Sequence, residues 1–243
     1  MNIAVIFAGG IGSRMRRTGM PKQFLMLGDK PVLIRTIEVF SKNKDVDGIV
    51  VVCHKDYINY LGDLIKQFSI QKIIGVVNGG RTGQESIYNG LSFLVEKTKN
   101  ENIENPLVLL HDGVRPFIRD ELVSRCVREA KRFGNCVVAA PAIETIGEIG
   151  SGQTIKGVLK RESCLLLKAP QTFFLEDIYK CHVKAIQEGK DNFVDSAHMV
   201  VEYGGKLHFT LCEASNIKIT TPIDFFTAKA LIKNQEYKDV YGI

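Results

Sequence analysis

The chain begins with an apolar run that leads directly into a glycine-rich loop: Asn2-Ile3-Ala4-Val5-Ile6-Phe7-Ala8-Gly9-Gly10-Ile11-Gly12-Ser13-Arg14. Residues 2–7 are typical of a buried strand. The loop would then lie at the carboxyl end of that strand, where open α/β sheets bind ligands and backbone N–H groups can face phosphate oxygens. Arg14 and Lys22 bring positive charge to it. We therefore expect a triphosphate-binding loop, the alternative being an ordinary tight turn followed by a solvated basic segment.

Two better-known phosphate motifs do not match this loop. Met15 stands where the dinucleotide fingerprint needs its third glycine, and the Walker pattern needs a Gly-Lys-Ser/Thr end that is missing here. A nicotinamide oxidoreductase is therefore a weak alternative. Four basic residues and no acid lie between positions 14 and 22: Arg14, Arg16, Arg17 and Lys22. This charge indicates a strongly anionic ligand.

Length and composition indicate a single globular domain over residues 1–243, because 45% hydrophobic content can form a full core. We see no secretory leader and no apolar stretch long enough to cross a bilayer, so we expect a cytoplasmic protein without a membrane partner. The net charge is +5, but basic residues alternate with acids along the expected helices, which argues against nucleic acid as a partner. Six cysteines without a C-x-x-C pair support neither disulfides nor zinc.

Strand-like apolar runs alternate with segments of helical periodicity along most of the chain. The runs cover residues 2–7, 47–53, 72–77, 107–110 and 135–140. The helical segments cover residues 31–43, 55–68, 81–99, 120–133, 176–189, 195–203 and 221–235. This alternation predicts an α/β fold with a doubly wound, mainly parallel sheet.

One segment interrupts the alternation. Residues 142–158 alternate apolar and polar side chains around a Gly150-Ser151-Gly152 turn, which predicts a β-hairpin. We place an inserted arm at about 142–165. Two strands alone are marginally stable, so we expect the arm to pack against a second subunit; the alternative is a decorative surface hairpin.

Four further clusters would reach the same sheet edge as the first loop. Residues 78–86 follow the third strand and offer small residues and Ser86 for a base-and-ribose pocket, unless the glycines only turn the chain into the helix. Asp112 follows the apolar run 107–110 and could hold Mg²⁺, which needs only one or two carboxylates besides phosphates and water. Alternatively, Asp112 caps a turn and Arg115 pairs with an acid.

The third of these clusters, residues 215–224, reads as a short strand that enters a helix, with Thr221 as N-cap, Pro222 at N1 and Asp224 at N3. Lys218 faces opposite to its apolar neighbours and, taken alone, could be a solvated strand residue. After the hairpin, Lys160-Arg161 could bind a second anionic substrate, and Ala169-Pro170-Gln171-Thr172-Phe173 returns the chain toward the sheet. The alternative for this region is a charged edge strand.

Together these motifs resemble the cytidylyltransferases that act on methylerythritol phosphate or ribitol phosphate. The resemblance covers nearly the whole chain in the right order, and it is carried by Gly-Gly-x-Gly-x-Arg-Met, Pro-Lys-Gln-Phe, His-Asp-x-x-Arg-Pro-Phe, Pro-Gln-Thr-Phe and Asn-Ile-Lys-Ile-Thr-Thr-Pro-x-Asp. It implies a Rossmann-like α/β domain whose β-arm clasps the partner in a homodimer. It also implies CTP and a small polyol phosphate as substrates.

The resemblance implies roles for individual residues. Arg14, Lys22 and Lys218 would surround the triphosphate and the transferring phosphorus, and Asp112 would bind Mg²⁺. Thr145 and Arg161, the latter from the neighbouring subunit's arm, would contact the polyol phosphate. The nucleotide would be bound by residues of three loops: Phe7, Ala8, Gly9, Gly10, Gly12, Ser13, Gly79, Gly80, Arg81, Ser86, Asp112, Gly113 and Arg115.

Departures from the family pattern bear on the acceptor. Methylerythritol phosphate enzymes usually read His-Asp-Ala-Ala-Arg-Pro and carry Thr before Pro-Gln, whereas this chain has Gly113-Val114 and Ala169. It also has Val194 in place of a Thr, and it is more similar to the ribitol phosphate branch, which includes bifunctional capsule enzymes. We expect D-ribitol 5-phosphate as acceptor, with CDP-ribitol as product. The alternatives are 2-C-methyl-D-erythritol 4-phosphate, as in isoprenoid biosynthesis, and a non-catalytic nucleotide-binding relative. An Arg common in the family is absent at Gly83, and whether Arg81 replaces it is open.

Overall fold

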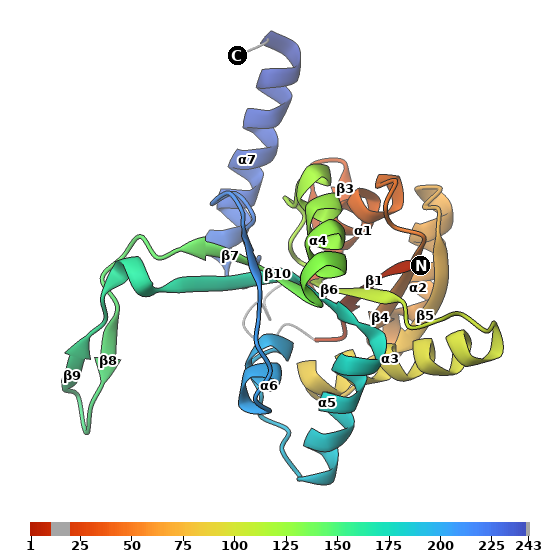
Figure 1. Cartoon of the computed structure of the whole chain (residues 1–243). Helices are drawn as coiled ribbons and strands as arrows, with labels where there is room; N and C mark the ends of the chain where they lie inside the picture. Colours follow the sequence, from red (N-terminus) through yellow and green to blue (C-terminus); the bar gives the residue numbers. More distant parts are fainter. Residues whose placement is uncertain (11–19, 242–243) are drawn as a thin grey trace.

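The computed structural model describes residues 1–10 and 20–241, with side chains up to residue 234, and its centre is a seven-stranded sheet (Figure 1). The strands occur in the order β11-β7-β10-β6-β1-β4-β5. Their bounds are β1 Asn2–Ala8, β4 Gly48–Cys53, β5 Ile73–Asn78, β6 Leu107–Asp112, β7 Asn135–Pro141, β10 Leu165–Phe174 and β11 Phe209–Leu211. The five strands predicted from apolar runs all form, within two residues of their expected bounds.

The sheet is wound in two directions from its centre. β1 pairs in parallel with β4 and β4 with β5, whereas β6 lies on the other side of β1. The winding direction therefore reverses between β1 and β6, and ligands bind at such a switch point in open α/β sheets. The predicted doubly wound, mainly parallel sheet is confirmed.

β10 runs antiparallel to both of its neighbours, β6 and β7. A charged edge strand was one alternative for the segment after the hairpin, but β10 lies between two other strands. Lys168 and Pro170 made this segment a poor candidate for the interior of a sheet, because proline cannot donate to a strand ladder. The register between Leu167 and Gln171 is in fact irregular there.

Helices cover both faces of the sheet, as the helical periodicity predicted. Their bounds are α1 Val32–Lys42, α2 Ile58–Gln67, α3 Gly83–Asn100, α4 Asp120–Phe133, α5 Leu175–Gln187, α6 Ser196–Glu202 and α7 Pro222–Tyr241. Shorter elements are the 3₁₀ turns η2 Lys22–Phe24, η3 Lys55–Tyr57 and η4 Arg161–Ser163 and the small strands β2 Met26–Leu27 and β3 Lys30–Pro31.

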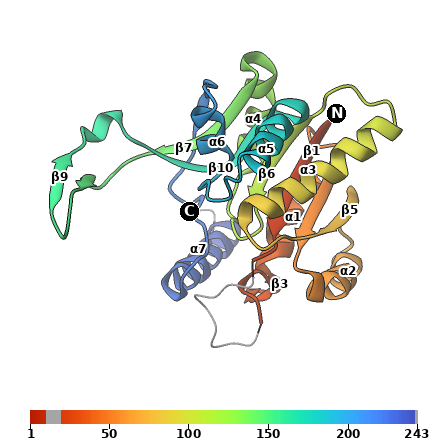
Figure 2. The ribbon, with the colours of Figure 1, turned by 90° about the horizontal axis from the view of Figure 1, so that it is seen from below.

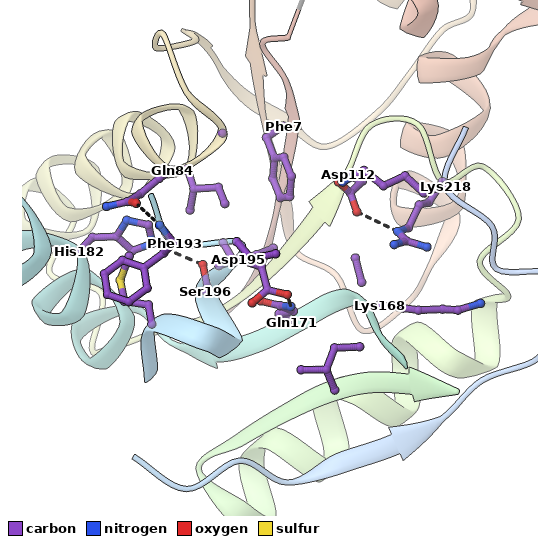
Figure 3. Close-up of a pocket in the computed structure, with 18 residues that line it drawn as sticks. Phe7, Gln84, Asp112, Lys168, Gln171, His182, Phe193, Asp195, Ser196 and Lys218 are labelled. Atoms are coloured by element: carbon purple, nitrogen blue, oxygen red, sulfur yellow. Dashed lines mark hydrogen bonds and ion pairs between the residues drawn. The ribbon is translucent and has the colours of Figure 1, made fainter. Parts of the chain in front are cut away.

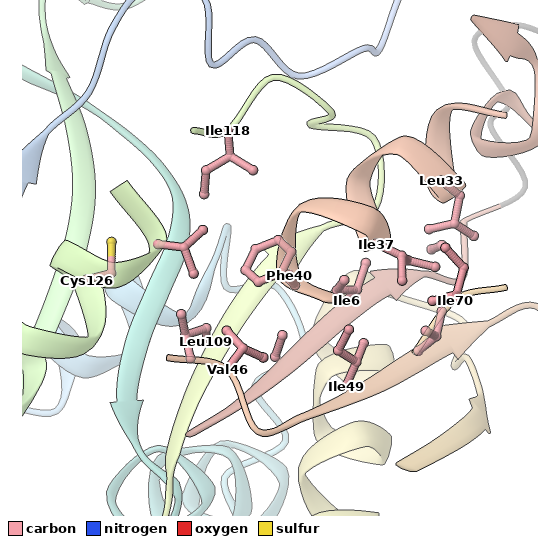
Figure 4. Packing of buried hydrophobic residues seen from close by; sticks show 14 of the residues in the cluster. Ile6, Leu33, Ile37, Phe40, Val46, Ile49, Ile70, Leu109, Ile118 and Cys126 are labelled. Carbon is pink, nitrogen blue, oxygen red and sulfur yellow. The ribbon is translucent and has the colours of Figure 1, made fainter. Parts of the chain in front are cut away.

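Successive side chains of a strand point to opposite faces of the sheet, so each strand packs against helices on both faces. On β1, Ala4 and Ile6 pack in the cluster that contains residues of α1, α2 and α4, whereas Ile3 and Val5 pack with residues of α3, α5 and α6. Figure 4 shows Phe40 of α1 among the apolar side chains of the first cluster. Each large apolar side chain buried in this way stabilises the fold by roughly 1.5–3 kcal/mol, so the core fixes the positions of the strand ends.

A hairpin projects from the body of the molecule (Figures 1 and 2). It consists of β8 (Gly147–Ile149) and β9 (Ile155–Val158), which pair antiparallel as the sequence predicted. Its apolar side chains lie in solvent in the single chain, with Ile149 85% and Ile155 73% exposed. Among the described helices, none is both long and apolar enough for a bilayer span.

Candidate active site

The site is built at the switch point between β1 and β6. Phe7 and Asp112 stand opposite each other in the register of these strands, and the Gly113 N–H donates to the Phe7 carbonyl at 3.0 Å. Gly113 allows this segment to pack closely, since an added Cβ would lie 2.8 Å from a Leu33 methyl and 3.0 Å from the Ala8 Cβ. The carboxylate of Asp112 is thereby placed beside the start of the glycine-rich loop.

The loop after β5 lies against the loop after β1. A Cβ added at Gly9 would lie 2.8 Å from the Ser86 Oγ and 3.2 Å from the Gly79 Cα. The buried Ser86 hydroxyl accepts from the Gly80 N–H at 3.0 Å and donates to the Thr82 carbonyl at 2.8 Å. Glycine is therefore required at Gly9 by close approach, and Ser86 holds the loop that carries Gly79 and Gly80.

Arg81 is placed away from these contacts. Its side chain is 94% exposed and lies 3.5 Å from Glu85, whose carboxylate also accepts from the Arg81 N–H at 2.8 Å. It borders a separate hollow between α3 and α5 together with Lys190. The structure therefore does not bring the Arg81 side chain to Asp112.

Gln23 is a residue to which the sequence analysis gave no role. It lies in η2, is 1% exposed, and its amide donates to the carbonyls of Ala8 at 2.7 Å and Gly10 at 3.0 Å. These bonds fix the described start of the glycine-rich loop and place Lys22, the preceding residue, next to it. The available signal was a polar residue between Pro-Lys and an apolar Phe-Leu pair. The predicted site residues Gly12, Ser13 and Arg14 lie outside the described residues.

A cluster of charged side chains surrounds Asp112. Its Oδ2 lies 2.8 Å from Arg115 Nε and its Oδ1 lies 2.5 Å from Lys218 Nζ. Burial by itself would raise the pKa of the Asp112 carboxyl, but the charges of Lys218 and Arg115 outweigh that effect and hold the pKa below its ordinary value. Arg115 thus pairs with an acid, as one alternative expected, and that acid is Asp112 itself.

The segment before α7 brings Lys218 to this cluster from far along the chain. The Ile219 N–H donates to the Val114 carbonyl at 2.9 Å, and the Ile219 side chain is buried. At the start of α7, Asp224 accepts from the Thr221 N–H at 2.7 Å and Thr221 Oγ1 accepts from the Asp224 N–H at 3.4 Å. The predicted capping arrangement is confirmed, and it fixes the chain direction next to Lys218. The short strand expected before this helix does not form: the segment that carries Lys218 has no strand pairing and is held by single contacts such as that of Ile219.

Asp112, Arg115 and Lys218 line a cavity of about 260 Å³ (Figure 3). Lys168 lies at the same end of the cavity, and Phe7 lies in the middle. Gln84 of α3, His182 of α5 and Phe193, which precedes α6, lie at the opposite end (Figure 3). The cavity therefore has a charged end with Asp112, Lys168 and Lys218 and another end with amide, imidazole and aromatic side chains.

Gln171, from the Pro-Gln motif, connects the sheet to α6. Its amide nitrogen donates to Asp195 Oδ2 at 2.8 Å, and its amide oxygen accepts from the Ala197 N–H at 2.9 Å. Asp195 also caps α6 by accepting from the His198 N–H at 2.8 Å. Neither role was predicted, because the sequence does not reveal which distant carboxylate a strand glutamine meets.

Thr145 and Arg161 lie on the arm and are not among the residues that line this cavity in the same chain. Thr145 is exposed, and the half-exposed Arg161 donates to the Ile143 carbonyl at 3.4 Å. Within one chain the structure therefore keeps these two predicted acceptor-binding residues apart from Asp112.

The residues present fit a divalent metal held largely by substrate. The described part of the chain contains no group of three His, Cys, Asp or Glu side chains able to hold a metal. Asp112 is a deprotonated carboxylate that lines the cavity, and each oxygen has one basic partner and a further lone pair. Magnesium needs only one or two protein carboxylates when phosphates supply other ligands, so Asp112 is a suitable ligand.

Comparison with known proteins places the chain in a family. Residues 2–234 match the family model of IspD, described as 2-C-methyl-D-erythritol 4-phosphate cytidylyltransferase. Ribitol-5-phosphate cytidylyltransferases of Vibrio parahaemolyticus and Streptococcus agalactiae are 45% and 39% identical to it, with full coverage of both chains. The crystal structure of 4-diphosphocytidyl-2C-methyl-D-erythritol synthase from Anaerococcus prevotii superposes with a TM-score of 0.82 at 26% identity, over 96% of each chain. The chain therefore belongs to the 2-C-methyl-D-erythritol 4-phosphate cytidylyltransferase (IspD) family.

Proposed function

We propose that the chain is a CTP-dependent cytidylyltransferase that transfers CMP to D-ribitol 5-phosphate, producing CDP-ribitol and pyrophosphate. The observation that carries the proposal is the pairing of Asp112 with Arg115 and Lys218 at the switch point of the sheet, beside the glycine-rich loop. Such a site suits the transfer of a nucleotidyl group from a triphosphate to a phosphate, because both reactants are anions. Ribitol phosphate is favoured over methylerythritol phosphate by the names of the relatives at 45% and 39% identity.

The reaction needs no protein nucleophile. The second pKa of a phosphate monoester is about 6, so the acceptor phosphate is largely dianionic near neutrality. One of its oxygens forms a bond to the α-phosphorus of CTP, and the bond from that phosphorus to the bridging oxygen breaks, so that pyrophosphate leaves with the electron pair. The work of the protein is to position both phosphates and to offset their charge.

We divide this work among the residues of the site as follows. Arg115 and Lys218, held by Asp112, offer positive charge at the charged end of the cavity. Lys22, with Arg14, would bind the triphosphate, and the loops of Gly9 and Gly79 would hold cytidine. A bound Mg²⁺ would add positive charge at the phosphate oxygens, with Asp112 as its protein ligand. Chelation with EDTA should then stop pyrophosphate release, and added Mg²⁺ should restore it.

The arm supports a homodimer as the working form. Its apolar side chains Ile149 and Ile155 would gain from burial against a second copy, and an isolated hairpin is marginally stable. Thr145 and Arg161 would then reach the partner's cavity, where a polyol phosphate needs polar contacts. A cytoplasmic location fits the use of CTP. Sedimentation of the full chain should give a dimer, and deletion of 147–158 should give a monomer with little activity.

The substrate test uses the full chain with CTP, Mg²⁺ and each polyol phosphate in turn. Pyrophosphate release is followed by a coupled assay, and ³¹P NMR identifies the diphosphate product. We expect release with D-ribitol 5-phosphate. Release with 2-C-methyl-D-erythritol 4-phosphate alone would favour the second candidate, which agrees with the family description and the A. prevotii structure. Binding of CTP without turnover would instead identify a non-catalytic relative.

A further inference from the structure

Lys168 is a basic residue at the charged end of the cavity that the mechanism above does not use. It lies in β10, where Leu167 is opposite Ala139 but Gln171 is opposite Val137. Three residues, 168–170, therefore stand against the single residue Val138 of β7. Irregularities of this kind redirect side chains and are common next to active sites. Figure 3 shows Lys168 at the same end of the cavity as Asp112 and Lys218, far from Phe193.

The ammonium group of Lys168 has a backbone partner but no acid. Its Nζ donates to the Asn216 carbonyl at 3.1 Å, and Arg115 Nη1 donates to the same carbonyl at 3.0 Å. Among the described residues no carboxylate lies within ion-pair distance of it. Burial lowers the pKa of Lys168, and the nearby charge of Arg115 lowers it further. An anion that approaches this amine would stabilise its charged form.

The charges at this end do not balance. Arg115, Lys168 and Lys218 bring three positive charges to the cavity, and Asp112 and Asp195 bring two negative charges, which leaves a net positive charge. Asp112 pairs with Arg115 and Lys218, and Asp195 accepts from the Gln171 amide, so Lys168 is the cation of this group that has no acidic partner among the described residues. A phosphate monoester carries between about one and two negative charges near neutrality. We infer that Lys168 binds the phosphate group of the acceptor, alongside Arg115 and Lys218. This inference rests on the proposed function for the identity of the acceptor.

A purely structural role is the competing explanation, because Lys168 also supports the Asn216 carbonyl. Lys168→Gln separates the two explanations, since the glutamine amide still donates a hydrogen bond but carries no charge. Lys168→Arg keeps the charge. Lys131→Gln is the matched control, as Lys131 is an exposed residue of α4 away from the cavity.

Steady-state kinetics with D-ribitol 5-phosphate give the first readout. For Lys168→Gln we expect an acceptor KM about tenfold or more above that of the wild type, because a hydrogen bond to a charged group is lost. The KM for CTP should stay within about twofold of the wild-type value, because the substitution weakens binding of the acceptor and not of CTP. Lys168→Arg should recover most of the acceptor affinity, and Lys131→Gln should match the wild type. An unchanged acceptor KM in Lys168→Gln would overturn the inference.

Binding of inorganic phosphate gives a readout that does not depend on turnover. Calorimetry on the full chain without CTP should find weaker phosphate binding in Lys168→Gln than in the wild type and in Lys131→Gln. Equal binding in all three proteins, or no binding by the wild type, would overturn the role of Lys168. If the wild type releases no pyrophosphate with either polyol phosphate, the proposed function fails, and the phosphate comparison still decides whether Lys168 forms an anion site.

Discussion

Lys218→Ala separates the catalytic role of the charged cluster from its structural role. Lys218 Nζ lies 2.5 Å from Asp112 Oδ1, and the lysine side chain is 44% exposed while that of Asp112 is 11% exposed. A partly exposed ion pair contributes at most about 1 kcal/mol to the free energy of unfolding. Loss of one preorganised donor to a charged transition state costs about a hundredfold in kcat, which corresponds to about 2.7 kcal/mol. We therefore expect a large kinetic effect with a small change in stability.

The assay is pyrophosphate release with saturating CTP, Mg²⁺ and D-ribitol 5-phosphate, together with urea unfolding of the same preparations. Lys131→Ala is the control, because it removes an exposed lysine of α4 far from the cavity. Lys218 also contributes to the lowered pKa of Asp112, so the acid side of the pH–rate profile should move to higher pH in the variant. A Lys218→Ala protein with a kcat close to that of the wild type would show that Lys218 does not stabilise the transition state.

Three further predictions concern the surroundings of the site. Gln23→Leu leaves the Ala8 and Gly10 carbonyls without their donor. We therefore expect the free energy of unfolding in urea to fall by about 1–3 kcal/mol and the KM for CTP to rise. An unchanged KM would contradict the role given to Gln23. Gly9→Val forces apart the loops that meet at Gly79, and calorimetry should find CTP binding lost, whereas wild-type affinity would show that the close approach is not needed. Burial lowers the pKa of His182 to about 4 from 6.5, so the stability linked to its neutral form is complete above about pH 6.5 and falls by about 3 kcal/mol as the pH drops toward 4. His182→Gln should remove this loss of stability between about pH 6.5 and 4, as measured by thermal unfolding. An unchanged pH dependence in the variant would contradict the contribution assigned to His182.

The framework of the fold could be predicted from local patterns. α4 covers Asp120–Phe133 as expected, because its apolar positions have helical spacing and Gly134 ends it in the left-handed conformation. The strand runs were equally clear, since each is almost continuously apolar. Asp112 could be assigned to the site from the sequence because it follows an apolar strand whose carboxyl end meets those of its parallel neighbours, whereas Lys218 could be assigned to it only from the family motif.

The parts that could not be predicted depend on partners distant in the sequence. The neighbouring sequence does not reveal that Gln23 bonds to Ala8 or that Gln171 bonds to Asp195, because a buried side-chain amide can form hydrogen bonds with many different carbonyls and carboxylates. The position of β10 between β6 and β7 follows from long-range pairing, and its own residues argue against a central strand. The orientation of Lys168 depends on the irregular pairing of that strand, so its place in the cavity was also missed.

The most direct test of the account is a crystal structure of the full chain soaked with D-ribitol 5-phosphate and no CTP, so that no turnover occurs. We predict the phosphate group at the charged end of the cavity, with oxygens about 2.7–2.9 Å from nitrogens of Arg115, Lys168 and Lys218. A phosphate bound elsewhere on the chain, with these three side chains still turned toward Asp112 and Asn216 alone, would contradict the account.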